Sequence, residues 1–425
     1  MVRPEITEVR LKAFKSFIDQ TLPLGPVTTL IGRNSSGKSN ALDGLDVLSR
    51  LASGEELTDA LDGRNSQRGP VRSGSRGLAP HGTTQFSIGC TVASGDDTYI
   101  YDVTVDVEPT LTIHHERLTG PQGSLLYEVS GREETGLTVT VTSQKQGPNP
   151  TYTFRDSRLI LSQIPLRFGD DNATFQDLTT GAVAVDTALR SVFIADPIPS
   201  LMRAYVPRHD YELRRSGENL SAALAHLRET APDAFAIVED VARSVADGNV
   251  DGLSIAQSDL DDVMLTLREH FTTSSAPTPA RELSDGLLRM LAIATALQSG
   301  PNLLDITQPA TSAHLIIEEI DNGLHPAQIA TVRELVDNSY RQFGTRTLMT
   351  THNPALLDQI DTATVVVSYR DTTSGHSKLT RLIHLPDFTR ELAQRSLGQA
   401  VTAGKLLDDS MAANDFTALN ELLGI

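Results

Sequence analysis

The sequence predicts an α/β fold in which a largely parallel sheet is extended by an antiparallel β-lobe and a helical lobe. Two features predict the parallel sheet: short apolar runs typical of buried strands, and helical patterns between those runs. The runs are residues 27–31, 314–317, 345–350 and 364–369. A third feature predicts the β-lobe, because residues 85–154 contain β-rich stretches separated by Gly, Asp, Pro and Asn.

Along the chain, the first expected strand covers residues 6–14, where polar and apolar residues alternate. Helical spacing of apolar residues is found at 39–52, 220–227, 235–245, 283–297 and 328–340. Neither an internal repeat nor a long heptad pattern is found. We expect four segments: 1–84, the N-terminal part of the core; 85–155, the β-lobe; 156–300, the mostly helical lobe; and 301–425, the C-terminal part of the core with a terminal helix.

The composition narrows the class of protein. The chain has 425 residues and a net charge of −18, which argues against a protein that coats nucleic acid by bulk charge. Its only cysteine, Cys90, excludes an internal disulfide framework and favours a reducing compartment, so we expect a cytoplasmic protein. Runs of about eighteen apolar residues are absent, and no membrane span is expected.

A phosphate-binding loop is expected between the second strand and the first helix. Its glycines allow the backbone N–H groups to turn toward an anion, and the following helix adds the positive end of its dipole. Lys38 would reach the β- and γ-phosphates of ATP, and the Ser39 hydroxyl would bind Mg²⁺. A Gly/Ser turn that contains a lysine by chance is the alternative. The residues are Gly32, Arg33, Asn34, Ser35, Ser36, Gly37, Lys38 and Ser39, which match G-x-x-x-x-G-K-[ST], followed by Asn40.

Two acidic residues follow the apolar run at 314–317. At such a strand end, Glu318 would hold the metal ion and Glu319 would act as the base for the attacking water. Two solvated acids at a strand exit are the alternative. His352 follows the strand at 345–350, where a neutral imidazole could hydrogen-bond the γ-phosphate. Taken alone, such a histidine is more often a surface or capping residue.

These motifs, in this order, resemble the ABC-type ATPase heads of the RecF, SMC and overcome-lysogenization-defect group. Stand-alone prokaryotic ATPases of the AAA_21 kind are the most similar members. The resemblance covers about residues 5–370 and implies a P-loop NTPase fold. The matching stretches are LKAFKSF, GRNSSGKSN, ELSDGLLRMLAI, IIEEIDNGLHP and TTHNPALLD.

The resemblance also implies a role for residues outside the loop. It identifies Leu283 to Gly286 as the ABC signature, in which Ser284 and Gly286 contact the γ-phosphate of a nucleotide held by the opposite subunit. An ordinary helix N-cap would have the same sequence. Lys15 and Ser16 match a segment near the nucleotide.

The chain departs from the family pattern at two points. The metal-binding acid is usually Asp, whereas this chain has Glu318. The glutamine that marks the Q-loop is not evident, and Gln85 and Gln163 are both candidates.

The leading functional hypothesis is an ATPase that forms a head-to-tail homodimer, or a higher multiple, around ATP and Mg²⁺. By analogy with the group, it would regulate a separately encoded nuclease or toxin effector in antiviral defence. About 245 residues separate the loop from the signature, with no coiled-coil arm between them. The 73 residues after His352 leave no room for a fused nuclease domain.

Two alternatives remain at this stage. One is a RecF-like clamp that binds DNA in an ATP-dependent way, through four arginines of a Gly/Ser-rich loop, or else that loop is a solvated surface segment. The other is a scaffold that uses ATP only to lock its dimer, without hydrolysis. The four arginines are Arg64, Arg68, Arg72 and Arg76.

Overall fold

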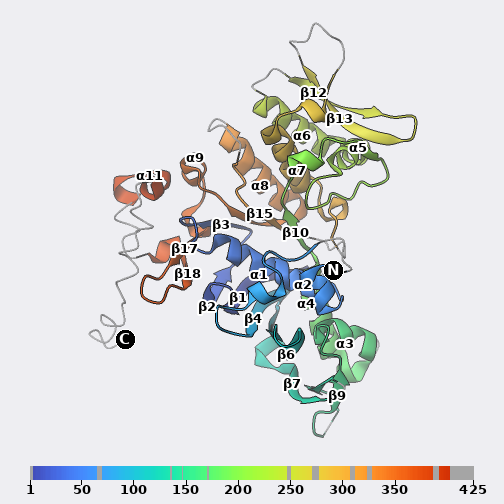
Figure 1. The fold of residues 1–425 in the computed structure, drawn as a ribbon, viewed down its shortest axis with the longest axis vertical. Coiled ribbons are helices and arrows are strands. Elements are labelled where there is room, and N and C mark those ends of the chain that lie inside the picture. The colour runs from blue at the N-terminus through green and yellow to red at the C-terminus, as the bar shows by residue number, and fades with distance from the viewer. Residues whose placement is uncertain are drawn as a thin grey trace.

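A computed structural model describes most of the chain. The described residues are 3–64, 69–134, 136–145, 147–169, 172–246, 250–269, 277–306, 312–322, 328–385 and 392–402. Within them, one 14-stranded sheet runs through the molecule (Figure 1). Its strand order is β10-β15-β16-β3-β17-β18-β2-β1-β4-β5-β6-β7-β8-β9.

Five neighbouring strands form the parallel part of this sheet. They are β10 (Val192–Ala195), β15 (His314–Ile317), β16 (Arg346–Thr350), β3 (Val27–Ile31) and β17 (Val365–Arg370). The parallel core expected from the sequence is thus present. Because the carboxyl ends of parallel strands meet at one edge of a sheet, the residues after β3, β15 and β16 are brought together there.

The remaining strands continue the sheet, mostly in antiparallel pairs. They are β18 (Ser377–Arg381), β2 (Phe17–Pro23), β1 (Pro4–Phe14), β4 (Gln85–Ser94), β5 (Asp97–Asp106), β6 (Thr112–Thr119), β7 (Leu125–Glu133), β8 (Gly136–Val141) and β9 (Thr151–Phe154). The run β4 to β9 is the antiparallel region expected from residues 85–154. It pairs with the core through β1 and β4, so the two regions share one sheet.

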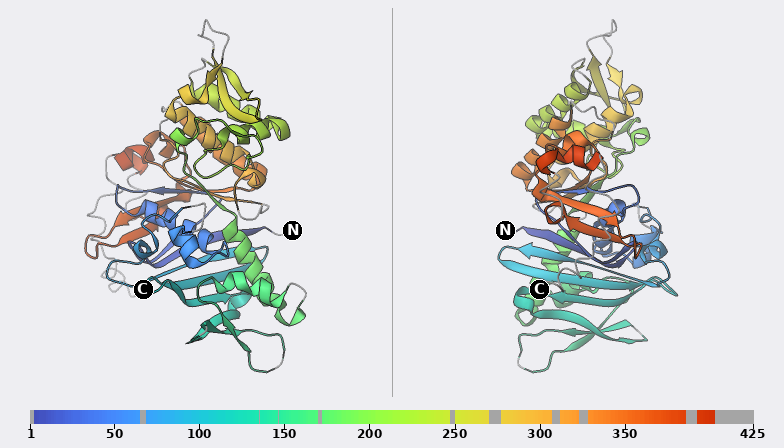
Figure 2. Two further views of the ribbon diagram at one scale, coloured as in Figure 1. Left: turned by 45° about the vertical axis from the view of Figure 1, so that its right-hand side comes forward. Right: turned by 90° about the vertical axis from the view of Figure 1, so that its left-hand side faces the viewer.

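Helices cover both faces of the parallel strands. In Figures 1 and 2, α1 lies on one side of β3, β15 and β10, and α7 and α8 lie on the other. Helix α1 (Lys38–Leu51) also contacts α2 (Leu57–Asp62), whereas α4 (Gln176–Arg190) packs on the antiparallel strands β1, β4 and β7, and α3 (Ile160–Phe168) packs on α4. On the other side, α5 (Leu220–Thr230) and α6 (Pro232–Val245) pack on α7 (Asp285–Gln298), α9 (Pro354–Leu357) packs on α8 (Ile329–Phe343), and α11 (Leu397–Thr402) packs on α9.

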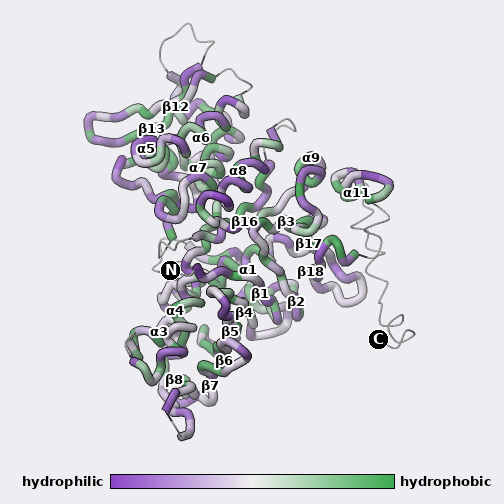
Figure 3. The backbone as a smooth tube through the Cα atoms, turned by 180° about the vertical axis from the view of Figure 1, so that it is seen from behind, coloured by the Kyte–Doolittle hydropathy of each residue, from purple (hydrophilic) through white to green (hydrophobic). Residues whose placement is uncertain are grey.

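Alternation along the short central strands explains how these two helix layers are held. In β15, Leu315 and Ile317 pack into the apolar cluster shared with α5 to α8, whereas Ile316 packs into the cluster shared with α1. Successive side chains of a strand point to opposite faces, so a fully apolar run binds helices on both. Figure 3 shows apolar and polar residues mixed along the helices and the outer strands, as expected for elements with one buried face.

The region 156–300 contains more strand than we expected. It holds β10, which forms the edge of the core sheet, and a small second sheet of β11 (Val206–Pro207), β12 (Val250–Gln257), β13 (Asp262–Glu269) and β14 (Thr278–Pro279). A four-residue apolar run such as β10 has the same pattern as part of a buried helix, so its periodicity alone could not identify it.

Short 3-10 turns connect several elements. They are Ser75–Leu78, Pro121–Gly123, Ala173–Phe175, Pro199–Leu201, Ala280–Glu282, Pro301–Leu303, Thr362–Thr364 and Leu382–His384. The last described helix is α11, and residues 403–425 lie outside the described residues, so the expected terminal helix stays a prediction. A search of the described helices finds none with the length and apolar character needed to cross a bilayer.

Candidate functional site

The expected phosphate loop connects β3 to α1. Two of its positions require glycine, because a Cβ on Gly32 would lie 2.2 Å from the Ser368 carbonyl oxygen and one on Gly37 would lie 2.4 Å from the Ser377 hydroxyl oxygen. Gly37 also has a φ of 110°, in the region that favours glycine. Helix α1 begins directly after the loop, so its first N–H groups and its dipole face the same space.

Neighbouring residues hold the loop in this shape. The Ser368 hydroxyl donates to the Ser36 carbonyl oxygen (3.0 Å), and Arg370 Nε donates to the Ser35 carbonyl oxygen (3.1 Å). The Ser36 hydroxyl is buried and has no hydrogen-bond partner among the described residues. A glycine-lined turn with a spare buried hydroxyl fits a phosphate group.

Lys38 is folded back onto the loop. Its Nζ donates to the carbonyl oxygens of Gly32 (2.8 Å) and Arg33 (3.0 Å), and the side chain is buried. Burial lowers the pKa of Lys38, and the charges of Glu319 and Glu318 only partly oppose this. The ammonium group is therefore held by neutral carbonyls, which a phosphate can replace with a stronger, charge-assisted partner.

Glu318 lies immediately after β15 and reaches the start of α1. Its Oε1 accepts a short hydrogen bond from the Ser39 hydroxyl, and its Oε2 accepts one from Arg72 Nη2 (2.7 Å). Burial raises the pKa of Glu318, but the hydrogen bonds from Arg72 and Ser39 and the charges of Arg72 and Lys38 outweigh it, so the pKa is lowered overall. Two hard oxygen ligands from opposite elements thus meet here, which fits Mg²⁺.

Arg72 belongs to a larger charged network that the sequence did not reveal. Lys15 Nζ lies 2.7 Å from Asp43 Oδ2 and also donates to the Arg72 carbonyl oxygen (3.1 Å). Arg72 Nε lies 3.7 Å from Asp43 Oδ1. The matched segment around Lys15 therefore supports the arginine that contacts Glu318.

The four-arginine loop is not a uniform basic surface. Arg72 turns inward to Glu318, and Arg76 lies 3.5 Å from the Glu108 carboxylate, while Arg64 is exposed. Arg68 lies outside the described residues. The spacing in the sequence could not show this, because the acceptors are far away along the chain.

The expected base and histidine follow neighbouring parallel strands. Glu319 has a φ of 52°, its N–H donates to the Thr350 hydroxyl (2.8 Å), and its side chain is exposed. His352 is also exposed and follows β16. Burial and the charge of Lys38 lower the pKa of His352, and the charges of Glu319 and Asp321 oppose this only in part. The imidazole is therefore neutral at pH 7.

The start of α1 is also tied to the turn between β1 and β2 and, through it, to β18. Asn40 Nδ2 donates to the Ser16 hydroxyl (2.8 Å), which also accepts from the Ser377 hydroxyl (2.8 Å). Asn40 and Ser16, both expected near the nucleotide, are thus joined to each other and support the loop.

The residues expected to form the signature lie on the other face of the sheet. Ser284 is the N-cap of α7, where its hydroxyl accepts from the Leu287 N–H (3.3 Å), and Gly286 is in the first helical turn. Ser284 is exposed. One contact links α7 to the nucleotide side, because Arg289 Nη2 donates to the Glu318 carbonyl oxygen (2.9 Å). Residues 323–327, which include the matched His325 and Pro326, lie outside the described residues.

In a search against protein families, residues 27–358 match AAA_21, described as "AAA domain, putative AbiEii toxin, Type IV TA system". The chain belongs to the AAA_21 family. This confirms the expected ABC-type ATPase head. No curated protein matches the sequence.

Solved structures similar to this AAA_21 protein include SMC heads. A head bound to the C-winged-helix domain of ScpA is 14% identical, covers 88% of this chain and 97% of its own, and has a TM-score of 0.48. The SMC head domain from Thermotoga maritima is 13% identical over 89% of this chain and 98% of its own (TM-score 0.42). A head from Pyrococcus furiosus is 12% identical, covers 92% of this chain and 100% of its own, and has a TM-score of 0.44.

Neither glutamine considered for the Q-loop of this AAA_21 protein reaches the phosphate loop. Gln85 Nε2 donates to Asp106 within the antiparallel strands (2.6 Å), and Gln163 Nε2 donates to backbone carbonyls around the start of α3. The residue that follows β10, beside the end of β15, is Asp196, since Ala195 is in register with Ile317. Sequence reasoning missed it because β10 itself was not recognised.

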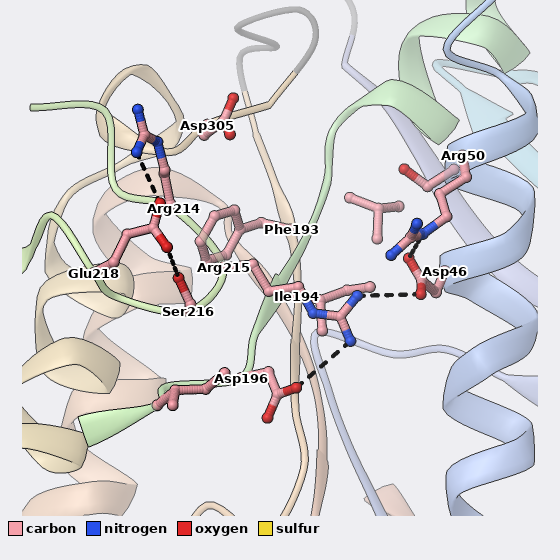
Figure 4. Close-up of a pocket in the computed structure, with 13 residues that line it drawn as sticks. Asp46, Arg50, Phe193, Ile194, Asp196, Arg214, Arg215, Ser216, Glu218 and Asp305 are labelled. Carbon is pink, nitrogen blue, oxygen red and sulfur yellow. Dashed lines mark hydrogen bonds and ion pairs between the residues drawn. The ribbon is translucent and has the colours of Figure 1, made fainter. Parts of the chain in front are cut away.

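A cavity of about 640 Å³ adjoins the site between α1, β10 and the segment 214–218. Figure 4 shows Arg215 between Asp46 of α1 and Asp196, at 3.3 Å and 3.7 Å from their carboxylate oxygens. A small adjacent hollow is lined by Asp196, Arg72 and Glu318 among others. In this AAA_21 protein, Arg215 thus connects α1, through Asp46, to the residue that follows β10, Asp196.

Proposed function

We propose that this protein binds ATP with Mg²⁺, hydrolyses it in a head-to-tail homodimer, and uses the cycle to regulate a separately encoded effector. The observation that carries the proposal is the meeting of five side chains at one edge of the parallel sheet. They are Lys38, Ser39, Glu318, Glu319 and His352, which come from the ends of β3, β15 and β16.

Each side chain has a chemical task that its surroundings permit. Lys38 can exchange two neutral carbonyls for phosphate oxygens. Ser39 and Glu318 would hold Mg²⁺, which neutralises charge on the phosphates when bound. Glu319, exposed and oriented through its own N–H, can accept a proton from water, and neutral His352 can donate a hydrogen bond to a phosphoryl oxygen.

The homodimer is proposed from the separation of the signature from the loop. Ser284 and Gly286 start a helix on the opposite face of the sheet from α1, and they are accessible. A serine N-cap with free N–H groups suits an anion brought by a second molecule. In a head-to-tail pair, each signature would cover the nucleotide of the other subunit.

The effector is proposed at the level of the family. The family description refers to a toxin of a type IV toxin–antitoxin system, which agrees with a role in antiviral defence. An ATP switch does useful work only when its two states bind something differently. A separately encoded nuclease or toxin is the partner we propose.

Three variants test the enzyme and the dimer. Lys38→Ala should weaken ATP binding by about 100-fold or more, since a charge-assisted contact contributes about 1.5–3 kcal/mol and Lys38 would make several. Glu319→Gln should bind ATP normally and lose turnover. Ser284→Arg should bind ATP as a monomer and fail to dimerise. Wild-type hydrolysis by Glu319→Gln would refute the assignment of the base.

The effector is tested with the full chain. The purified protein should cleave neither DNA nor RNA under any nucleotide condition, and a tagged copy should retain the product of a neighbouring gene. Mg²⁺-dependent nuclease activity that is lost by a change outside the ATP site would contradict the separate effector.

A further inference from the structure

We infer that Arg203 is a positioning residue for the signature: it holds residues 280–285 in the shape that receives nucleotide from a second subunit, and it neutralises Asp285. The inference rests on the proposed function, in which Ser284 and Gly286 act on the nucleotide of the opposite subunit. The sequence offered no sign of it, because Arg203 is about 80 residues from the signature.

One guanidinium group, that of Arg203, donates hydrogen bonds to several backbone carbonyl oxygens just before α7. Arg203 Nη1 donates to the carbonyl oxygens of Arg281 (2.8 Å), Leu283 (2.8 Å) and Ala280 (3.3 Å). These carbonyls belong to the single 3-10 turn before α7 and to the residue that precedes the Ser284 N-cap. The direction in which the chain enters α7 is therefore set by a side chain from another segment.

The same guanidinium also controls charge. Arg203 Nη2 lies 2.5 Å from Asp285 Oδ1, and Asp285 is the first helical residue of α7, with 77% of its side chain exposed. An acid in the first turn stabilises a helix but repels an approaching polyphosphate. With Arg203 in place, the end of α7 carries an ion pair instead of a bare negative charge.

Arginine suits both tasks better than lysine does. A guanidinium has five N–H donors in a fixed plane, so it can bind several carbonyls and a carboxylate together. A lysine ammonium would keep the positive charge beside Asp285 but lose the planar arrangement. Arg203→Lys should therefore behave as an intermediate between the wild type and Arg203→Met.

The first experiment separates the signature from the phosphate loop. Arg203→Met is made in a Glu319→Gln background, which keeps ATP intact, and is compared with Arg203→Lys. Binding of a fluorescent ATP analogue by the monomer should change less than twofold. The dissociation constant of the ATP-dependent dimer, measured by sedimentation, should rise by about tenfold or more. Unchanged dimerisation of Arg203→Met would overturn the inference.

Arg208→Met is the matched control. Arg208 lies five residues further along and forms an ion pair with Glu229 on α5, away from the signature turn. Its loss removes an arginine of the same segment without touching residues 280–285. Dimerisation should match that of the background, and an equal loss in both variants would assign the effect to the lobe as a whole and overturn the inference.

The second experiment gives a readout that a folding defect would not produce. Arg203→Met has an intact phosphate loop and an altered signature, whereas Lys38→Ala has the reverse. At a protein concentration at which neither variant alone forms a detectable ATP-dependent dimer, the mixture should form dimers with one productive site. Failure of the mixture, while Ser284→Arg mixed with Lys38→Ala succeeds, would overturn the inference.

The charge effect is tested by adding Asp285→Asn to Arg203→Met. This double variant should recover part of the lost dimerisation, because the side chain at position 285 no longer carries a charge that needs a partner. If dimerisation does not recover, the claim that Arg203 acts by neutralising Asp285 is overturned. If Ser284→Arg dimerises normally, the head-to-tail dimer itself is wrong, which is a different outcome from a failure confined to Arg203.

Discussion

Glu318 at the phosphate loop and Glu116 in the antiparallel strands are both carboxylates that accept several hydrogen bonds, yet their surroundings differ. Glu318 is partly exposed and is held by Arg72 and by the Ser39 hydroxyl. Glu116 on β6 is fully buried and is held by neutral donors. Those donors are the hydroxyls of Tyr101 (3.1 Å) and Tyr127 (2.8 Å) and the N–H groups of Ile160 (2.7 Å) and Leu161 (2.8 Å).

The pKa values of the two groups move in opposite directions. Burial raises the pKa of Glu116 to about 7, although all four hydrogen bonds oppose it. At Glu318 burial also raises the pKa, but Arg72 and Ser39 reverse the result. The difference lies in the cation, because a nearby positive charge compensates for burial where neutral donors do not. A cation can also be exchanged for another cation, so Glu318 suits a metal site. The neutral donors around Glu116 have no such replacement, so Glu116 suits a permanent structural contact between β6 and the start of α3.

The largest expected effect on stability comes from removing the hydrogen-bonded contact at Glu116. Glu116→Ala leaves two tyrosine hydroxyls and two N–H groups without their acceptor and detaches the start of α3 from β6. We expect a loss of about 3–5 kcal/mol in the free energy of unfolding, measured with urea. Glu128→Ala, which removes a carboxylate on the adjacent strand that pairs at the surface with His115 and Arg117, should cost less than about 1 kcal/mol. Equal losses would show that the four donors do not matter.

The pH dependence of stability should come next in size. The folded pKa of Glu116, about 7, is above the ordinary glutamate value of 4.5, so the folded state binds the proton more tightly than the unfolded state does. Its contribution is fully present below pH 4.5 and is lost as the pH rises to 7. A difference of about 2.5 units corresponds to about 3 kcal/mol. Buried His314, whose pKa burial lowers to about 3, contributes in the opposite sense over part of this range, so the wild type is compared with Glu116→Gln, in which His314 is unchanged. In urea unfolding between pH 4.5 and 7.5, the stability of the wild type relative to Glu116→Gln should decline as the pH rises. A difference that stays constant or increases over that range would contradict the prediction.

The smallest effect concerns the exchangeable cation at Glu318. In Arg72→Met the carboxylate no longer has a competing positive partner, so Mg²⁺ should bind more readily. The pair is about half-exposed, and such pairs contribute up to about 1 kcal/mol, which is about a fivefold change. The Mg²⁺ concentration that half-saturates nucleotide binding should fall about two- to fivefold, with binding in EDTA measured alongside. Arg76→Met, which removes a surface pair with Glu108, should not change it. A higher Mg²⁺ requirement would show that Arg72 assists the metal.

Contiguous motifs account for what could be predicted. The strand at residues 27–31 and the loop after it were expected where the structure has them, and the helix expected at 39–52 is α1, Lys38–Leu51. The acids after β15 and the histidine after β16 also lie at the expected strand ends. Each of these signals depends on neighbouring residues: glycine for unusual backbone angles, apolar runs for buried strands, and a cap for a helix.

The sequence by itself determined the local parts of this protein, and tertiary structure decided how they are connected. Arg72 and Glu318 are 246 residues apart, and Glu116 and Leu161 are 45 apart. Such partners follow from the order of strands in the sheet and from the helices placed on its faces. No single stretch of sequence contains that order, because it depends on which apolar faces bury one another. The sequence could therefore predict a phosphate loop, but not that Arg72 contacts Glu318, the acid proposed to bind the metal, or that Arg203 contacts the segment proposed as the signature.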